Sequence, residues 1–323
     1  MKRDAAAPLG GVAKGEATHM NEMNLLDELA HAEALLIEGQ TDEAQDYLAR
    51  LAEDAEEYVD RNCHTTSEVQ WFSFPTIFER LAYRRVEGDP RELRDVGEPL
   101  DRLYNDLALA AVRNGDYDTA MEALRQAVRW NPMGCEYRLN LADLYRIAGD
   151  PNEYLALSFS VFARASDARH LVRAFVNFSE YFQVAEKPDC AAAALRAARR
   201  FGLSDSQLDA ALELAAESDH DPDSVSDDEA RDLLAQEGLP DGANAEVAVC
   251  LLMCASDAAA LGQRDVATDL TIRARDLVGE QTCKALLALI REGDASEDAA
   301  TEGVAEGVSA EGDPSTKGGD ADA

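Results

Sequence analysis

The chain has 323 residues, of which 46% are hydrophobic and only 6% aromatic, and it carries a net charge of −34. A surface this negative repels phosphate backbones and anionic lipid, so we expect neither nucleic acid nor a membrane among its partners. The abundance of Ala and Leu favours helix, and no Val-, Ile- and Thr-rich run alternates with period 2. We therefore expect an all-α protein with essentially no strands.

The N-terminal segment, residues 1–20, is small and polar and contains glycine, so we expect it to be disordered. Met1, Met20 and Met23 all remain open as starts of translation. No positively charged leader precedes an apolar run, and no stretch of about 18 apolar residues occurs. The sequence therefore predicts a cytoplasmic protein.

Residues 21–100 are predicted to form degenerate helical hairpins. Apolar or small side chains recur with helical spacing around a turn at Glu38–Asp42, at Leu35, Gly39, Ala44, Leu48 and Leu51. Glu28 and His31 occupy positions that the same spacing would make apolar. This hairpin is therefore less regular than those that follow.

The densest apolar patch of the chain runs from Trp71 to Phe78. One interpretation is an exposed docking face for a partner, because large aromatic side chains supply much of the binding energy at interfaces. The other is a buried helical stripe, since Trp71, Phe74, Phe78 and Leu81 follow one another at helical spacing. We favour burial, with Pro75 kinking that helix or starting its main part.

Residues 101–134 show the most regular pattern. Small and apolar residues stand where two crossing helices would touch, with Pro132 closing the unit: Tyr104, Leu107, Ala108, Ala111, Ala120, Leu124 and Ala127. Ala108 and Ala120 are small enough for the two helix backbones to approach closely. Gly115 is placed to end the first helix and Asp116 to cap the second.

Two further copies follow. The second has matching residues on its first helix, at Arg138, Leu141, Ala142 and Tyr145, and a turn at Gly149–Pro151. Its second helix departs from the pattern, with Tyr154 and Ser158 at contact positions. The third copy is offset by a short insertion, turns at Glu186–Pro188, and places Phe175, Phe178, Ser179, Phe182, Ala191, Leu195 and Ala198 at contact positions.

This repetition resembles the tetratricopeptide-repeat superfamily, specifically over residues 101–202 and more weakly over 25–58 and 248–281. The resemblance implies an all-α fold, a right-handed α-solenoid of antiparallel helical hairpins with disordered termini. Such hairpins make a surface that holds a partner and carry no chemistry of their own.

The resemblance and the composition together divide the chain into segments. Residues 101–216 form the central repeats, and 217–228 an acidic linker. Residues 229–291 form C-terminal hairpins that end in a capping helix over 280–291. The remaining residues, 292–323, form an acidic disordered tail with ten acidic residues and one basic residue. Because a capping helix covers the apolar end of an array, we expect a monomer.

In a tetratricopeptide array the first helix of each hairpin lines a concave groove. The positions that face a ligand there include six polar candidates for partner contact: Arg102, Asn105, Asn140, Arg146, Arg173 and Asn177. They also include the apolar residues Leu109, Val112 and Leu139. An amide can hold a ligand backbone through paired donor and acceptor contacts, and a guanidinium can bind a carboxylate with two hydrogen bonds. The resemblance therefore implies a protein-interaction scaffold or adaptor whose groove binds a peptide or helix of a partner.

Two alternatives stay open, a regulatory subunit of an enzyme or signalling complex and a self-associating structural module. The chain has no phosphate loop and no nucleophile or metalloprotease motif, so we expect no catalytic residues and no cofactor. Cys250 and Cys254 stand one helical turn apart and Cys63 adjoins His64, which could suggest a metal site. The six cysteines lack paired zinc-ligand spacing, so we expect buried thiols and no metal.

Overall fold

The computed structural model describes residues 25–216 and 221–292. The predicted N-terminal extension, residues 1–20, lies outside these ranges, as do residues 217–220 of the predicted linker and the tail from residue 293 onward. The chain divides into two compact units, unit 1 up to Arg164 and unit 2 from Ala165. Each unit is described by itself.

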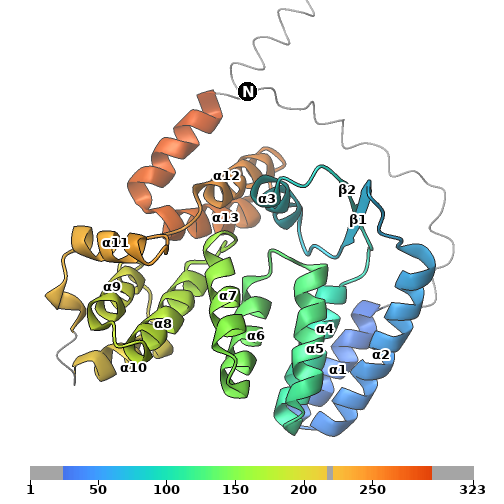
Figure 1. Ribbon diagram of the computed structural model, residues 1–323. Coiled ribbons are helices and arrows are strands. Elements are labelled where there is room, and N and C mark those ends of the chain that lie inside the picture. Colours follow the sequence, from blue (N-terminus) through green and yellow to red (C-terminus); the bar gives the residue numbers. More distant parts are fainter. Residues whose placement is uncertain (1–24, 217–220, 293–323) are drawn as a thin grey trace, which may run out of the picture. The chain divides into compact units, whose positions relative to one another are not determined.

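Unit 1 contains three helical hairpins. They are α1 (Leu25–Glu38) with α2 (Thr41–Asn62), α4 (Leu100–Asn114) with α5 (Tyr117–Trp130), and α6 (Cys135–Ala148) with α7 (Pro151–Phe162). Figure 1 shows their helices side by side, and α2 packs on α4 and α5 on α6. Ala108 and Ala120 are buried in this packing, as the spacing predicted.

The turns of the second and third hairpins use the same chemistry. Gly115 and Gly149 end α4 and α6 with φ of 75° and 77°, a backbone conformation that glycine adopts without strain. The next residue then caps the second helix: the Asp116 carboxylate accepts from the Thr119 amide, and that of Asp150 from Asn152 and Glu153. The Asp116 cap agrees with the sequence prediction, and Asp150 lies in the predicted turn.

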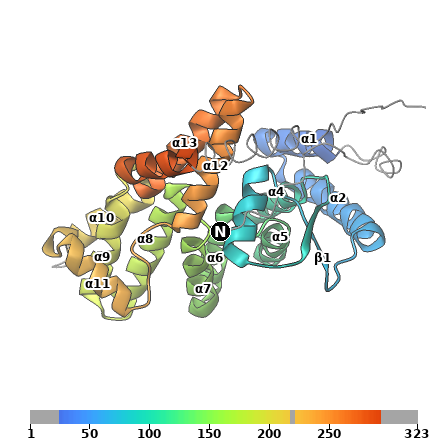
Figure 2. The same cartoon turned by 90° about the horizontal axis from the view of Figure 1, so that it is seen from above.

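A β–α–β insertion separates the first two hairpins of unit 1. It consists of β1 (Val69–Phe72), α3 (Ile77–Glu87) and β2 (Glu92–Asp95). The strands are parallel, with Val69 opposite Glu92. Figure 2 shows β1 from above, near the end of α5, and the Ser73 amide after β1 donates to the Trp130 carbonyl at 2.9 Å.

The insertion corrects two expectations from the sequence. Two short strands occur where we expected essentially none, and the predicted helical stripe is wrong for Trp71 and Phe74, which lie on β1 and in the next loop. The helix begins only after Pro75, where the Thr76 hydroxyl accepts from the Phe78 amide and caps α3. Side chains along β1 alternate between partly buried and buried, which is the two-residue period of a strand and not helical spacing.

The aromatic side chains of the insertion pack mostly inward. The rings of Phe72 and Phe74 stack with centroids 4.9 Å apart, and Tyr83 approaches Phe72 at 4.7 Å. Phe72 and Phe78 are buried, and Trp71 is partly buried against the hairpin core with its indole N–H donating to the His64 carbonyl. Burial is therefore the better description of this patch.

Unit 2 contains α8 (Ala168–Val184), α9 (Pro188–Arg199), α10 (Ser206–Ala216), η1 (Pro222–Ser224), α11 (Asp227–Gln236), α12 (Ala245–Ala260) and α13 (Arg264–Val278). A further helical segment covers residues 280–292. The pairs α8–α9 and α12–α13 form hairpins, and η1 and α11 pack on α9. Within the predicted linker, residues 221–228 thus contain a short helical turn and the start of α11.

Apart from the two short strands, the described residues form helices, turns and loops, so the predicted all-α helical-repeat class is confirmed. No helix within the described ranges is long and apolar enough to cross a membrane.

Candidate partner-binding face

The six predicted contact residues fall into the two units. Arg102 and Asn105 lie on α4, and Asn140 and Arg146 on α6, all in unit 1. Arg173 and Asn177 lie on α8 of unit 2, where Asn177 is buried. The candidate face is therefore built here from α1, α4 and α6 of unit 1, and the contribution of α8 stays a prediction.

One end of this face is held by a charged cluster between α1 and α4. The Arg102 guanidinium donates to Glu33 Oε1, with Nε at 2.8 Å. Asp106, one helical turn further along α4, is 7% exposed, and within the described residues its Oδ2 accepts no hydrogen bond. Burial, reinforced by the nearby Glu33 carboxylate, raises the pKa of Asp106 to about 7.

The open part of the face combines apolar and polar side chains. Leu109 is 41% exposed and Val112 38% exposed, both at ligand-facing repeat positions of α4. On α6, Arg146 is exposed 4.0 Å from Asp143, and Asn140 is half-buried. Leu139, which the repeat register assigned to the groove, is fully buried instead. Large apolar residues open to solvent beside polar ones are typical of a surface that contacts another protein.

A buried polar network connects the insertion to the second and third hairpins of unit 1. Asp101, at the start of α4, is 2% exposed, and its Oδ2 accepts from the Asn131 amide and the Tyr137 hydroxyl, both at 3.1 Å. The Ser73 hydroxyl lies 3.3 Å from Oδ1 and donates to the Glu98 carbonyl at 2.7 Å. Burial raises the pKa of Asp101, although these contacts favour its ionised form.

A second contact joins α3 to the third hairpin. Arg164, after α7, pairs with Glu87 at the end of α3, and its Nη1 donates to the Ser160 carbonyl at 3.0 Å. Arg138 donates to the Ser160 hydroxyl at 3.2 Å and to the Pro132 carbonyl. Burial, and repulsion from Arg164, lower the pKa of Arg138 to about 10. Glu87 therefore neutralises the half-buried guanidinium group of Arg164, whereas Arg138 is held by Ser160 and Pro132.

Replacement of Glu87 by glutamine is expected to lower the free energy of unfolding by about 1–2 kcal/mol, because a partly buried charge loses its partner. Urea denaturation followed by circular dichroism measures this loss, and added salt should reduce it. Glu153→Gln, on the exposed side of α7, is the matched control. Equal unfolding midpoints for Glu87→Gln and the wild type would show that Arg164 does not need this carboxylate.

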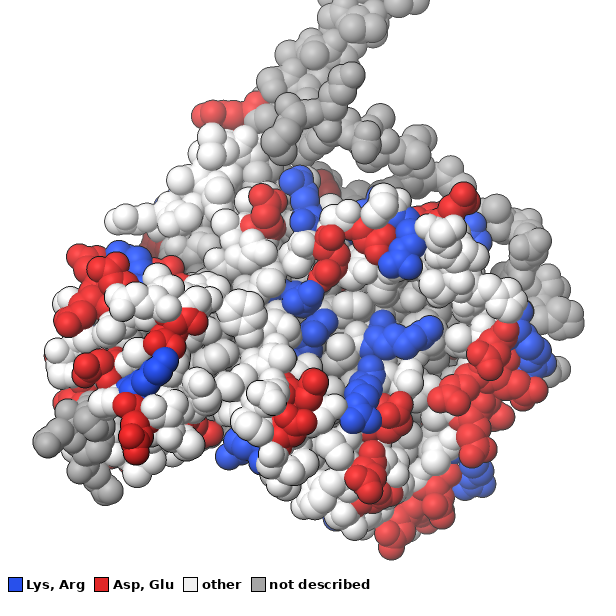
Figure 3. Space-filling view, in the orientation of Figure 1, with Lys and Arg blue, Asp and Glu red and all other residues white. Residues whose placement is uncertain are grey.

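The charge of unit 1 is unevenly distributed. Helix α2 carries eight carboxylates against two arginines, Arg50 and Arg61. Helix α5 exposes Arg125 and Arg129, and α3 exposes Arg80, Arg84 and Arg85. Figure 3 shows acidic side chains over the α2 edge and basic ones over α5. Unit 1 therefore has basic as well as acidic surface, although the chain as a whole is strongly negative.

The cysteines do not form a metal centre within the described ranges. No group of three or more His, Cys, Asp or Glu side chains there is arranged to hold an ion. Cys63, Cys135, Cys190, Cys250 and Cys283 are buried. Burial raises the pKa of the Cys63, Cys190 and Cys283 thiols, so these groups are not activated as nucleophiles.

Sequence reasoning missed the insertion and the buried carboxylates. Gly88, Asp89 and Pro90 after α3 are a turn signal that could have separated α3 from β2. Nothing local distinguishes Asp101, in the first turn of α4, or Asp106, further along the helix, from solvated aspartates. Their burial depends on α1, α6 and the insertion.

One comparison with known families gives a match. Residues 101–132 match the tetratricopeptide repeat family, which corresponds to α4, α5 and the turn after them. No curated protein matches the chain. The match coincides with the most regular repeat of the sequence.

Proposed function

We propose that this chain, which carries a tetratricopeptide repeat at residues 101–132, is a non-catalytic scaffold that binds a peptide or helix of another protein. The binding surface is the face of α4 and α6 in unit 1. One observation carries the proposal: Leu109 and Val112 are exposed at ligand-facing positions of the matched repeat. In a hairpin array these positions are free of packing between helices, so their apolar surface is available to a partner.

The polar residues beside them are suited to fix the direction of a bound segment. Asn105 and Asn140 present side-chain amides that can pair with a ligand backbone. Arg146, on the exposed side of α6, can bind a carboxylate of the ligand in place of Asp143. Arg102 is already held by Glu33, so its role is to position α4 against α1.

Photo-crosslinking tests the proposal in the intact chain. A benzophenone amino acid at Leu109 or Val112, introduced in the cells that naturally make the protein, is expected to crosslink a distinct partner. Mass spectrometry then identifies that partner. The matched control carries the same group at Tyr117, an exposed residue of α5 on the second helix of the same hairpin.

Substitution then tests the identified partner. Combining Leu109→Asp with Val112→Asp is expected to weaken its binding at least about tenfold, because two apolar contacts are replaced by charges. Circular dichroism checks that the variant remains folded. Equal crosslinking from Tyr117 and Leu109, or unchanged binding of the double variant, would contradict a binding site on this face.

A further inference from the structure

The basic surface of unit 1 lies on α5 and on the insertion, and none of its residues belongs to α4 or α6. Arg125 and Arg129 are exposed on the C-terminal half of α5, one helical turn apart. Arg94 is exposed on β2, beside the Trp71 ring of β1, and β1 contacts α5. Figure 3 shows basic side chains gathered over α5. We call these three arginines the arginine face.

Each guanidinium group of the arginine face is held against an aromatic ring. The guanidinium carbon of Arg129 lies 4.0 Å from the Trp130 ring centroid, and that of Arg94 lies 5.7 Å from the centroid of Trp71. A guanidinium that stacks on a ring keeps the N–H groups in its own plane directed outward. Binding would therefore remove less freedom from these side chains than from unrestrained arginines.

Arg125 is held in the same way. Its guanidinium carbon lies 5.7 Å from the Tyr145 ring centroid, and it donates to the Tyr145 hydroxyl from Nε at 3.2 Å and from Nη2 at 2.9 Å. Its Nη1 donates to Glu122 at 2.8 Å. These bonds use three of its five N–H groups, so two remain for a ligand.

The charges around the arginine face do not cancel. Arg125 pairs with Glu122 and Arg94 with Glu92, but within the described residues no carboxylate pairs with Arg129. Hydrogen bonds from Arg94 lower the pKa of Glu92, and the charges of two more arginines on α3, at positions 80 and 84, lower it further. Five arginines thus surround two glutamates, and this surface is positive.

The spacing of Arg125 and Arg129 fits an extended peptide. Four residues of an α-helix rise about 6 Å. Side chains on one side of an extended segment alternate with those on the other, so neighbours on the same side are about 6.6 Å apart. Carboxylates at alternate positions of a peptide can therefore each meet one guanidinium, which binds a carboxylate with two hydrogen bonds.

A short acidic peptide suits this surface better than nucleic acid does. Helix α2 of the same unit carries eight carboxylates against two arginines, and it repels a polymer with a phosphate at every step. A peptide can carry its charges only where the arginines lie.

We propose that the arginine face binds an acidic segment of a partner protein in extended form, with carboxylates at alternate positions bonded to Arg125 and Arg129 and a third bonded to Arg94. This contact is separate from the binding of a peptide or helix on the α4–α6 face and does not depend on it. A scaffold with both surfaces holds two different segments, one through apolar contacts and one through charge.

The probe is the capped peptide acetyl-Ala-Glu-Ala-Glu-Ala-amide, titrated into the full chain. Saturation-transfer NMR on the alanine methyl protons and calorimetry measure its binding. We expect a Kd near the millimolar range, because exposed ion pairs contribute little each, and weaker binding as salt rises. The peptide acetyl-Ala-Glu-Glu-Ala-Ala-amide has the same charge but places its carboxylates on opposite sides of an extended chain, so it should bind several-fold more weakly.

Variants locate the binding. Arg125→Gln with Arg129→Gln is expected to weaken binding of the first peptide at least tenfold. Arg50→Gln with Arg61→Gln removes the same charge from α2 and is the matched control, which should change the Kd less than about twofold. Circular dichroism checks that both variants remain folded.

Four outcomes would overturn the proposal. Equal weakening by the two double variants would show that only net charge matters, and equal binding of the two peptides would exclude the extended form. Tighter binding of an oligothymidylate of eight nucleotides would make the arginine face a nucleic-acid site. Peptide binding that appears only in a chain without residues 293–323 would assign the arginine face to the acidic segment of this chain instead of a partner.

Discussion

Replacement of Asp101 by alanine is expected to lower the free energy of unfolding of unit 1 by about 3 kcal/mol. The carboxylate accepts hydrogen bonds from Asn131 and Tyr137 inside the protein, so its removal leaves two buried donors without an acceptor. It also leaves a small cavity at the start of α4. The variant no longer has to bury a carboxylate away from water, and this gain offsets part of the cost.

Urea denaturation followed by tryptophan fluorescence is a suitable measurement, because Trp71 and Trp130 lie in the same core cluster of unit 1. Asp118→Ala, an exposed substitution near the start of α5, is the matched control and should change stability by less than about 0.5 kcal/mol. Asp101→Asn should fall between the two, since the amide retains one acceptor. A midpoint for Asp101→Ala equal to that of the control would mean that the network contributes no net stability.

The second large effect is a pH dependence that originates at Asp106. Its pKa is about 7 in the folded protein, against an ordinary value of 3.8, so the folded state holds this proton more tightly than the unfolded state. The resulting stability is present in full below about pH 4 and is lost as the pH rises through 7. The difference of about three units between the folded and the ordinary pKa corresponds to at most about 4 kcal/mol of stability.

Asp106→Asn should remove this pH dependence, because the amide does not titrate and can donate to Glu33. We expect the variant to match the wild type near pH 4 and to exceed its free energy of unfolding by about 2–4 kcal/mol at pH 8. Urea denaturation at several pH values measures the difference. Asp118→Asn controls for the general loss of repulsion when one carboxylate of an acidic chain is removed. Parallel pH profiles for Asp106→Asn and the wild type would assign the dependence to other groups.

The repeat could be predicted because its determinants are local. The helix contacts at Ala108 and Ala120 and the turns at Gly115 and Gly149 depend on spacing within one hairpin, and the structure confirms them. The same spacing assigned the six contact residues to the groove, by analogy with a tetratricopeptide array. Those assignments remain predictions, and Asn177 is buried where an exposed position was expected.

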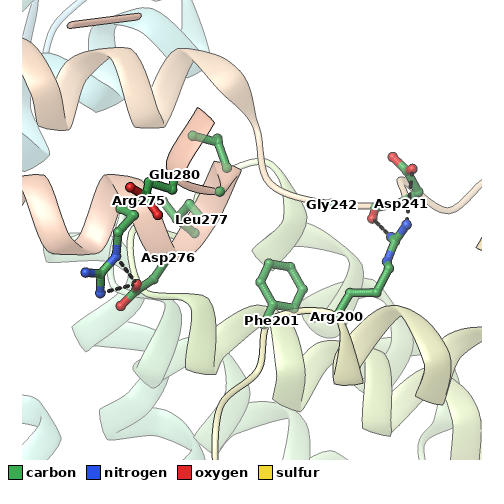
Figure 4. A pocket seen from close by; sticks show the side chains of 10 residues that line it. Arg200, Phe201, Asp241, Gly242, Arg275, Asp276, Leu277 and Glu280 are labelled. Carbon is green, nitrogen blue, oxygen red and sulfur yellow. Dashed lines mark hydrogen bonds and ion pairs between the residues drawn. The ribbon is translucent and has the colours of Figure 1, made fainter. Parts of the chain in front are cut away.

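The remaining features could not be read from the sequence because they depend on contacts between distant segments. Trp71 and Phe74 have helical spacing to Phe78, but the pairing of β1 with β2 overrides it. The pKa of Asp106 is raised by burial and by the Glu33 carboxylate, which α1 brings against α4. The cleft in unit 2 that Phe201, Asp241 and Leu277 line (Figure 4) is formed by segments that are distant in the sequence, so no local pattern predicts it.

The position of the β–α–β insertion has a consequence for how unit 1 assembles. Helices α2 and α4 pack together across a connection of residues 63–99, whereas α5 and α6 are joined by residues 131–134 alone. A connection roughly nine times longer costs about 2 kcal/mol more in loop-closure entropy. We therefore expect the α4–α7 hairpins to dock first during folding, and the α1–α2 hairpin to join after the strands have shortened the path between its end and α4.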